Sequence, residues 1–297
     1  MSLTESFANW YNKNYKLLLI IPAVLLISSL AILGYSFIQT GDFLEKDITL
    51  TGGTSITIIT ENQELNIDDI RNFLSKRTSN FYVREITDIR SGAQKAVIIE
   101  SPDQADDLKL IIEEFLNYNL TDENSSIEST GSSLSKSFYN QLKLAIVISF
   151  ILMSIVVFFI FRSFVPGFAV ILSAFADIIM TLAIVYLLGM KISTAGITAI
   201  LMLIGYSVDT DIMLTTRLLK REGEINKNIY SAFKTGITMT MTTFMAIAVA
   251  LFITKSFSNV LEQIFSILLI GLIFDIFNTW VTNASLLKWY IENKNKK

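Results

Sequence analysis

The sequence predicts a polytopic α-helical membrane protein with six transmembrane helices, arranged as one plus five, and one extracytoplasmic α+β domain of ferredoxin-like fold. Three observations lead to this prediction. Of the 297 residues, 52% are hydrophobic and only 17% are charged. Apolar residues form six runs of about 20 residues, the length that crosses a bilayer as a helix. One long polar segment, residues 39–141, separates the first run from the other five.

The six apolar runs predict both the spans and their orientation. Lys and Arg gather on the cytoplasmic side of membrane proteins, and twelve of them lie near the span ends on one side against five on the other. We therefore expect both termini in the cytoplasm and residues 39–141 outside. The first run lacks a small-residue cleavage site, so we expect it to remain as an anchor. The runs are 17–37, 142–161, 167–188, 195–216, 237–253 (its helix starting nearer Ala232) and 263–286.

The chain then divides into four parts. They are the N-terminus with the first span (1–38), the external domain (39–141), a five-helix bundle (142–287) and a cytoplasmic tail (288–297). The external segment holds 18 acidic and 9 basic residues, which indicates a solvated acidic surface.

The external segment has the pattern of a folded domain. Residues 55–60 alternate and are β-branched, which predicts a strand, and residues 68–76 have the apolar spacing of a helix. Residues 81–89 and 96–100 predict two strands joined by a turn at Ser91 and Gly92. Pro102 is expected to open a second helix, and a last strand is expected near 126–130. The order βαββαβ is that of a split βαβ, ferredoxin-like sandwich.

Several function classes are excluded by what the sequence lacks. The chain has no Cys and no His, so it has no disulfide, thiolate nucleophile, imidazole base or Cys- or His-ligated metal. It also lacks the GxxxxGK[ST] phosphate loop, so nucleotide-driven work is not expected. We predict neither an enzyme nor a cofactor, a metal or a nucleic-acid partner.

Four carboxylates lie inside the spans and are the candidates for proton or ion coupling. A charge at the bilayer centre costs roughly 2.5–3.5 kcal/mol, so each needs a partner, a proton or water. On a helix, residues two apart point about 200° away from each other. Asp209 and Asp211 can therefore face one partner only if a break forms near Gly205. The other two candidates are Asp177 and Asp275.

Polar stripes accompany these carboxylates on three helices. Lipid cannot satisfy such stripes, so we expect them to turn inward, towards each other, with most Ser and Thr serving helix packing. Lys234 stands at the mouth of one stripe. The stripes are Asp275, Asn278, Thr279 and Thr282; Thr235, Thr238 and Thr242; Ser207, Asp211 and Thr215; and Thr198, Met202, Gly205 and Asp209.

Several motifs together resemble the SecF family of protein-export membrane proteins, in its archaeal form. Residues 205–217 read GYSVDTDIMLTTR, from Gly205 to Arg217, and resemble the family's signature in the fourth span. Residues 47–54 read DITLTGGT, with Asp47, Gly52 and Gly53, and resemble the family's D-x-x-G-G motif. The stretch FRS at 161–163 leading to Asp177, and DIFNTW at 275–280, are also similar.

The resemblance implies a partner and a mechanism. SecF-like proteins work with SecD as two pseudo-symmetric six-helix halves of the resistance-nodulation-division type. They assist a SecYE-type translocon in moving unfolded secretory polypeptides, using the proton gradient. Where bacterial members carry Asn and then Asp, this chain has Asp209 and Thr210, and where they carry Arg in the fifth span it has Thr235, beside Lys234.

Two other functions remain open at this point. One is a half-size exporter of lipids or small molecules, and the other is a structural scaffold without ion flow. Arg217, Lys220 and Arg221 form a cytoplasmic cluster that is expected to set the orientation and contact lipid headgroups. A six-helix half with polar stripes needs a second half to bury them, so the residues themselves also predict a membrane partner.

Overall fold

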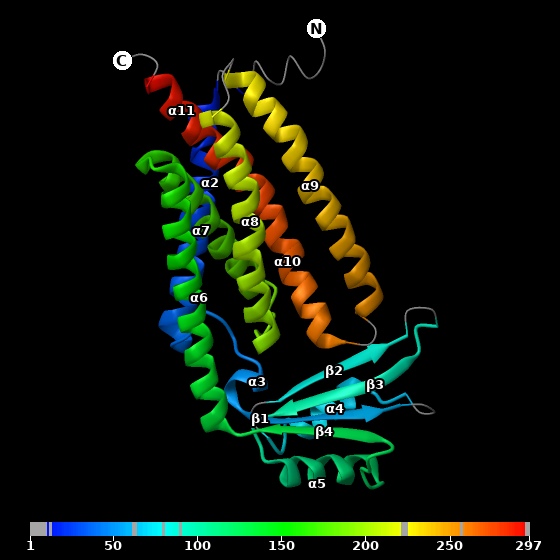
Figure 1. The fold of residues 1–297 in the computed structure, drawn as a ribbon. Coiled ribbons are helices and arrows are strands. Elements are labelled where there is room, and N and C mark those ends of the chain that lie inside the picture. Colours follow the sequence, from blue (N-terminus) through cyan, green and yellow to red (C-terminus); the bar gives the residue numbers. More distant parts are fainter. Residues whose placement is uncertain are drawn as a thin grey trace.

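The computed structural model describes residues 11, 14–60, 64–78, 81–88, 91–220, 225–255 and 258–294. In this part of the chain six helical segments are long and apolar enough to cross a membrane. They stand together as one bundle, and a small sheet domain lies at one end of it (Figure 1). The predicted fold class is thereby confirmed. The six segments are Asn14–Thr40, Leu134–Phe161, Phe164–Leu187, Thr194–Leu219, Ile225–Thr254 and Asn259–Lys294.

Two helices of the bundle begin earlier than hydropathy predicts. The helix α6 begins at Ser132, so the boundary expected after residue 141 falls inside it. The helix α9 begins at Ile225, before Ala232. Hydropathy marks where the bilayer ends, whereas polar residues can continue a helix beyond it. The bundle helices are α2 (Ile20–Thr40), α6 (Ser132–Phe161), α7 (Phe164–Leu187), α8 (Thr194–Lys220), α9 (Ile225–Thr254), α10 (Asn259–Phe277) and α11 (Ala284–Lys294).

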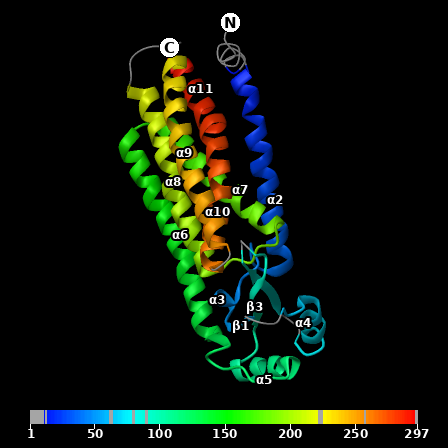
Figure 2. The same cartoon turned by 90° about the vertical axis from the view of Figure 1, so that its right-hand side faces the viewer.

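The last span contains a feature that the sequence did not predict. Between α10 and α11 the chain forms a π-helical turn, η1 (Asn278–Asn283), in which the backbone N–H of Ala284 bonds to the carbonyl of Thr279. The span therefore continues through three elements without leaving the bundle (Figures 1 and 2).

Helices α7, α8 and α10 form the packed centre of the bundle. Leu203 of α8 and Ile267 and Leu272 of α10 are almost completely buried in a shared apolar core. A Cβ at Gly271 of α10 would lie 2.5 Å from the Leu203 side chain, so the missing side chain lets these helices approach closely. Helices α6 and α9 stand at the flanks in Figure 1, and apolar side chains such as Ile151 remain exposed there, as lipid-facing residues do.

The sheet domain has the predicted split βαβ topology. Its elements follow the order β1, α4, β2, β3, α5, β4, and its four antiparallel strands lie in the order β2-β3-β1-β4. This is the ferredoxin-like arrangement. The elements are β1 (Gly53–Ile59), α4 (Ile67–Leu74), β2 (Tyr82–Thr87), β3 (Gln94–Ser101), α5 (Ala105–Leu116) and β4 (Ser125–Thr130), preceded by the short helix α3 (Ile48–Thr51).

Alternation along β1 divides the two faces of the sheet. Ile56 and Ile58 are fully buried and pack with Ile70 of α4 and with Leu108 and Ile112 of α5. The residues between them, including Ser55 and Thr57, lie on the opposite face. In Figures 1 and 2, α5 lies on the far side of the sheet from the bundle, and α11 lies at the opposite end of the molecule.

Some boundaries in the sheet domain differ from the prediction. Pro102 does not open a helix, because α5 begins at Ala105 with Gln104 as its N-cap. Residue Asn66 caps α4, and its side chain accepts a hydrogen bond of 3.0 Å from the backbone of Asp68. Of the predicted turn, Ser91 and Gly92 are described, whereas residue 89, the expected end of the preceding strand, lies outside the described residues.

Gly53 lies where the chain enters the sheet domain, and a substitution there tests whether the backbone requires glycine. Its φ is +143°, and a Cβ there would lie 2.5 Å from the carbonyl oxygen of Ser101. We predict that Gly53→Ala destabilises the protein by about 2 kcal/mol or more, because backbone strain and the clash add. The thermal unfolding midpoint in lipid nanodiscs is the measurement.

Gly41→Ala is the matched control. Gly41 also has a positive φ, +75°, but nothing lies within 4 Å of its Cβ position. Gly41→Ala should lower the free energy of unfolding only by the strain of a left-handed backbone, about 1–2 kcal/mol. An equal loss for both variants would contradict the role assigned to close approach at Gly53.

Candidate functional site

Three of the four candidate carboxylates come together inside the bundle. Asp177 on α7 and Asp211 on α8 are fully buried, and Asp275 on α10 is 1% exposed. Each of the three lies close enough to the other two to interact with them electrostatically. The packed centre of the bundle thus holds a carboxylate cluster, the term used below for Asp177, Asp211 and Asp275.

Hydroxyl and amide groups surround the carboxylate cluster. Asp177 accepts hydrogen bonds from the Ser207 hydroxyl at 2.5 Å and from the Asn278 amide at 2.7 Å. Asp275 accepts longer ones, from Thr279 at 3.3 Å and Thr210 at 3.4 Å. The polar stripes of α8 and of the last span therefore face each other at this point, as predicted for these two.

Asp211 is the least satisfied member of the cluster. Its Oδ1 accepts a hydrogen bond of 2.8 Å from the Asn283 amide. Its Oδ2 is buried and has no hydrogen-bond partner among the described residues. The hydroxyls of Ser173 and Thr279 are further polar neighbours. Sequence reasoning did not single out Ser173 or Asn283.

The ion pairs of the described residues do not include any member of the cluster. Three negative charges without a cation in a low-dielectric interior would be very costly, because burial of each ion costs several kcal/mol even after relaxation. Protons are the smallest means of neutralising them. Proton binding is therefore the chemistry that this arrangement of side chains is suited to.

Asp209 is separated from the cluster. Helix α8 runs unbroken through Gly205, so the break considered there does not form. Asp211 consequently points into the bundle, while Asp209, two residues away, is exposed on the other side of the helix. The two aspartates therefore face different sides, as the geometry of an unbroken helix predicts.

Two polar stripes do not turn inward, contrary to the expectation. On α8, Thr198, Met202, Gly205 and Asp209 are all exposed. On α9, Thr238 and Thr242 are exposed and Thr235 is half-buried, and Lys234, at the mouth of that stripe, is exposed as well. The inward positions of α8 are already taken by Ser207, Asp211 and Thr215, which are buried. Lys234 makes no ion pair with the cluster in the described part of the chain.

Arg217, at the end of the fourth-span motif, ties two helices together. Its guanidinium donates to the carbonyl of Ser231 at 2.7 Å and to its hydroxyl at 3.2 Å, joining the end of α8 to the start of α9. Arg221 and the side chain of Lys220, which we grouped with Arg217, lie outside the described residues.

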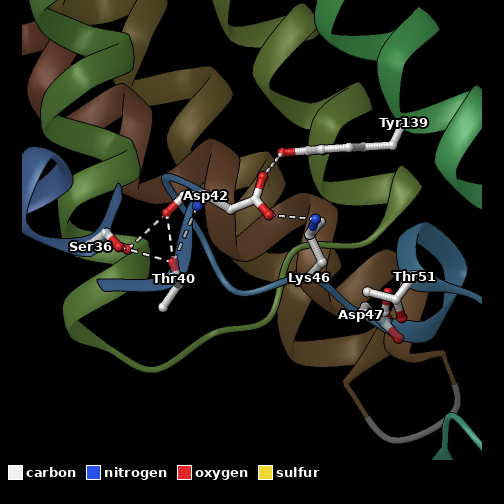
Figure 3. Close-up of polar contacts among 7 residues, drawn as sticks. All are labelled: Ser36, Thr40, Asp42, Lys46, Asp47, Thr51 and Tyr139. Atoms are coloured by element: carbon white, nitrogen blue, oxygen red, sulfur yellow. Dashed lines mark hydrogen bonds and ion pairs between the residues drawn. The ribbon is translucent and has the colours of Figure 1, made fainter. Parts of the chain in front are cut away.

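The linker between the first span and the sheet domain is fixed to the bundle. The Asp47 N–H donates to the carbonyl of Ile192 at 2.9 Å, and the Ile192 N–H donates to Glu45 at 2.7 Å, so the linker pairs with the α7–α8 loop. Figure 3 shows the segment before it, where Asp42 accepts a hydrogen bond of 3.3 Å from Tyr139 and pairs with Lys46 at 2.5 Å.

Gly52 and Gly53 then lead directly into β1, and both have positive φ, +83° and +143°. Asp47 lies further from Gly52 than the D-x-x-G-G spacing requires, because four residues separate them. Its N–H nevertheless holds the linker to the bundle, so the motif acts here as a structural joint.

A cavity of about 580 Å³ lies between the open face of the sheet and the end of the bundle. Glu100 of β3 lines it, together with Arg84 and Asp47. Burial raises the pKa of Glu100, Asp47 raises it further through charge and hydrogen bonding, and Arg84 and Lys191 oppose this. Glu100 pairs with Arg84 at 3.3 Å.

Comparison with known proteins gives consistent matches. Residues 111–293 match the family described as protein export membrane protein SecD/SecF, C-terminal. The chain is 38% identical over 291 residues to the protein-export membrane protein SecF of Methanocaldococcus jannaschii, covering 96% of this chain and 99% of the relative. It is 37% identical over 283 residues to SecF of Methanolacinia petrolearia, covering 95% of each.

Among solved structures, the chain is similar to SecDF of Thermus thermophilus, described as a translocon-associated membrane protein. The TM-score is 0.75 at 18% identity, and the likeness covers 98% of this chain but 40% of that one. The likeness is therefore one of fold, to a much longer chain.

Glu100 gives a prediction about pH. Its raised pKa means that, above its usual value of 4.5, the folded state holds the proton more strongly than the unfolded state does. Stability should therefore fall as the pH rises from 4.5 through the raised pKa. We predict that Glu100→Gln removes this fall, measured as unfolding midpoints between about pH 4 and pH 8.

Glu114→Gln is the control, because the pKa of Glu114 is shifted in the opposite direction to that of Glu100. Arg77 lowers the pKa of Glu114, so the ionised group favours the folded state above that pKa. This variant should be no more stable than the parent chain near neutral pH. A pH profile for Glu100→Gln identical to the parent's would show that Glu100 is not protonated preferentially in the folded state.

Proposed function

The chain belongs to the SecF family of protein-export membrane proteins, and from this premise we propose that it is an auxiliary export subunit driven by protons. In this proposal it works with a SecD-type partner beside a SecYE-type translocon. Together they assist unfolded secretory polypeptides across the cytoplasmic membrane.

The carboxylate cluster is the observation that carries the proton step. Three buried acids share one site without a cation in the described residues, so the number of protons they hold determines the local charge. One proton crossing 100 mV releases about 2.3 kcal/mol. That energy is available to shift α7, α8 and α10 relative to each other without nucleotide hydrolysis.

The exposed polar stripes support the proposal of a membrane partner. A carboxylate such as Asp209 cannot face hydrocarbon without a large cost, yet it is exposed on this chain together with Thr238 on α9. A second helix bundle of similar polarity would cover both. The much longer SecDF chain, of which this chain covers 40%, leaves room for such a half.

The orientation follows from charge. From the positive-inside rule we propose that both termini lie in the cytoplasm and that the sheet domain lies outside. In that orientation the domain stands where a polypeptide emerges, and the basic span ends face the headgroups of membrane lipids.

Asp211→Asn tests the proton step. Asparagine keeps the size of the side chain but cannot exchange a proton, so secretion of a reporter should fall to the level of a strain that lacks the chain. Proton uptake by proteoliposomes that contain the purified complex should be lost as well.

Asp209→Asn is the matched control, on the same helix but outside the cluster. It should retain proton uptake. The assignment to the buried cluster is wrong if Asp209→Asn abolishes uptake while Asp211→Asn preserves it. Full export by both variants and by the double variant would eliminate coupling through these groups.

Gly205 tests the partner surface. Nothing lies within 4 Å of its Cβ position on the exposed face of α8, so the Cβ of Gly205→Leu meets no atom of this chain. Small residues let neighbouring helices approach. We predict at least a tenfold loss of copurified SecD-type partner, about 1.4 kcal/mol.

Gly34→Leu on α2 is the matched control, since its Cβ position is equally open. It should copurify the partner at the parental level. Equal recovery of the partner with both variants would place the interface elsewhere on the bundle.

A further inference from the structure

The π-helical turn η1 joins two of the three carboxylates through one helix. Asn278 at its start donates to Asp177 on α7 at 2.7 Å, and Asn283 at its end donates to Asp211 on α8 at 2.8 Å. In an α-helix, residues five apart point about 140° away from each other. In a π turn the N–H of one residue bonds five residues back, so these two asparagines lie on nearly the same side of the helix. The turn is therefore what allows both contacts at once.

The surrounding packing accommodates the turn. A Cβ at Gly236 of α9 would lie 2.5 Å from the ring of Trp280, which sits in the middle of η1. Trp280 also meets Phe233 edge to face, with ring centroids 5.0 Å apart. The bulk of the turn thus fits against α9, while both amides point to the cluster.

The amides hold the turn most strongly when the carboxylates are charged. Hydrogen bonds to an ionised carboxylate are roughly twice as strong as those between neutral groups. A π turn is rare because the α-helix is the preferred backbone form, so η1 needs such contacts to persist. Asp211 is the member with an unpartnered oxygen, and protonation would weaken the single amide bond that holds Asn283.

We propose that η1 is a proton-controlled register switch and that Asn278 and Asn283 are its positioning residues. With Asp211 charged, both amides are engaged and the π turn persists. With Asp211 protonated, Asn283 is released and the segment returns to α-helical register. This inference rests on the proton coupling proposed above.

The switch has a defined output. If the π turn converts to α-helix, the helix register changes by one residue. Helix α11 then rotates by about 100° and moves about 1.5 Å along its axis. Helix α11 is held at the far end of the bundle, where Lys288 bonds Asn226 at 3.0 Å and Glu292 bonds Tyr15 at 2.5 Å. A proton at the cluster would thus change contacts between α11, α9 and the first span.

The titratable groups around Asp211 are those of the cluster itself. Asp177 faces it from α7 and Asp275 from α10. On α8 itself, Asp209 lies on the exposed side. On α11, Lys288 is engaged with Asn226 and lies 3.9 Å from Glu292. The response to pH should therefore be set by the three carboxylates.

Deletion of Val281 isolates the switch. Val281 is half-buried within the turn, and removing one residue converts η1 to α-helix. Asn278 and Asn283 then stand four apart and remain on one face. The variant keeps every carboxylate and both amides but has no π turn to close.

The chain has no Cys, so two introduced ones can be labelled cleanly. Trp289 on α11 and Tyr230 on α9 are exposed, and Trp289→Cys with Tyr230→Cys carries the spin labels. In the complex purified with its native partner, we expect the label separation to shift by several ångströms between acid and neutral pH, since the helix radius with side chains is about 5 Å. The Val281 deletion should show no shift.

Asn283→Ala provides a second variant should the deletion fail to fold. It should hold the labels at the acid separation at every pH, whereas Ser285→Ala, just beyond the turn, should respond like the parent. A parental chain without any pH-dependent shift overturns the switch, as does a full shift in Asn283→Ala. Loss of export in Asp211→Asn would leave the proton coupling standing in either case, so the two ideas fail separately.

Discussion

The structure depends on placing three acid side chains in one water-poor site. Like charges at close range in a low dielectric cannot all be ionised without a large cost. The bundle meets this constraint with hydroxyl and amide donors rather than with Lys or Arg. Ser207, Asn278 and Asn283 donate at 2.5–2.8 Å, and small residues such as Gly271 let the helices come close enough to do so. Because these donors are neutral, the net charge of the site changes with every proton.

The same two helices that carry Asp177 and Asp211 also hold the sheet domain. Their connecting loop pairs with the linker through Ile192 and Asp47, and Lys191 stacks over Tyr82 of β2 at 4.9 Å. The Thr194 N–H, at the start of α8, bonds the Thr49 hydroxyl at 3.3 Å. A displacement of α8 against α7 would therefore reach β2 directly through Lys191, and β1 through the linker and α3. This is a contiguous route, and energetic coupling along it is a separate question for double-mutant measurements.

Hydropathy was sufficient to predict the membrane spans, and strand periodicity was sufficient to predict the order of elements in the sheet domain. Both patterns arise because residues that are buried recur along the sequence. Helical geometry was sufficient to separate Asp209 from Asp211, since residues two apart point in opposite directions on an unbroken helix. Asn283 lies four residues after Thr279 and eight after Asp275, at the edge of the α-helical stripe that those two residues share. It was missed because its contact with Asp211 of α8 is a tertiary one. Tertiary contacts, Trp280 against Gly236 and Asn283 against Asp211, likewise favour the π turn. A periodic sequence pattern assumes one number of residues per helical turn, so it cannot predict where that number changes.

The two aspartates of the fourth span illustrate why we propose that this chain works with a partner bundle. Asp211 is satisfied, in part, by residues of its own bundle, whereas Asp209 lies on an exposed stripe with Thr198, Met202 and Gly205. The stripe crosses the depth of the membrane, where lipid offers neither donors nor water. Its glycine leaves space for a close neighbour, and Thr238 and Thr242 of α9 are exposed as well. A partner helix that covers this stripe would bring its own polar groups to Asp209, one helix diameter from the buried cluster. The partner's position and the cluster's charge would then be linked through α8, which carries Asp209 on its exposed side and Asp211 on its buried side.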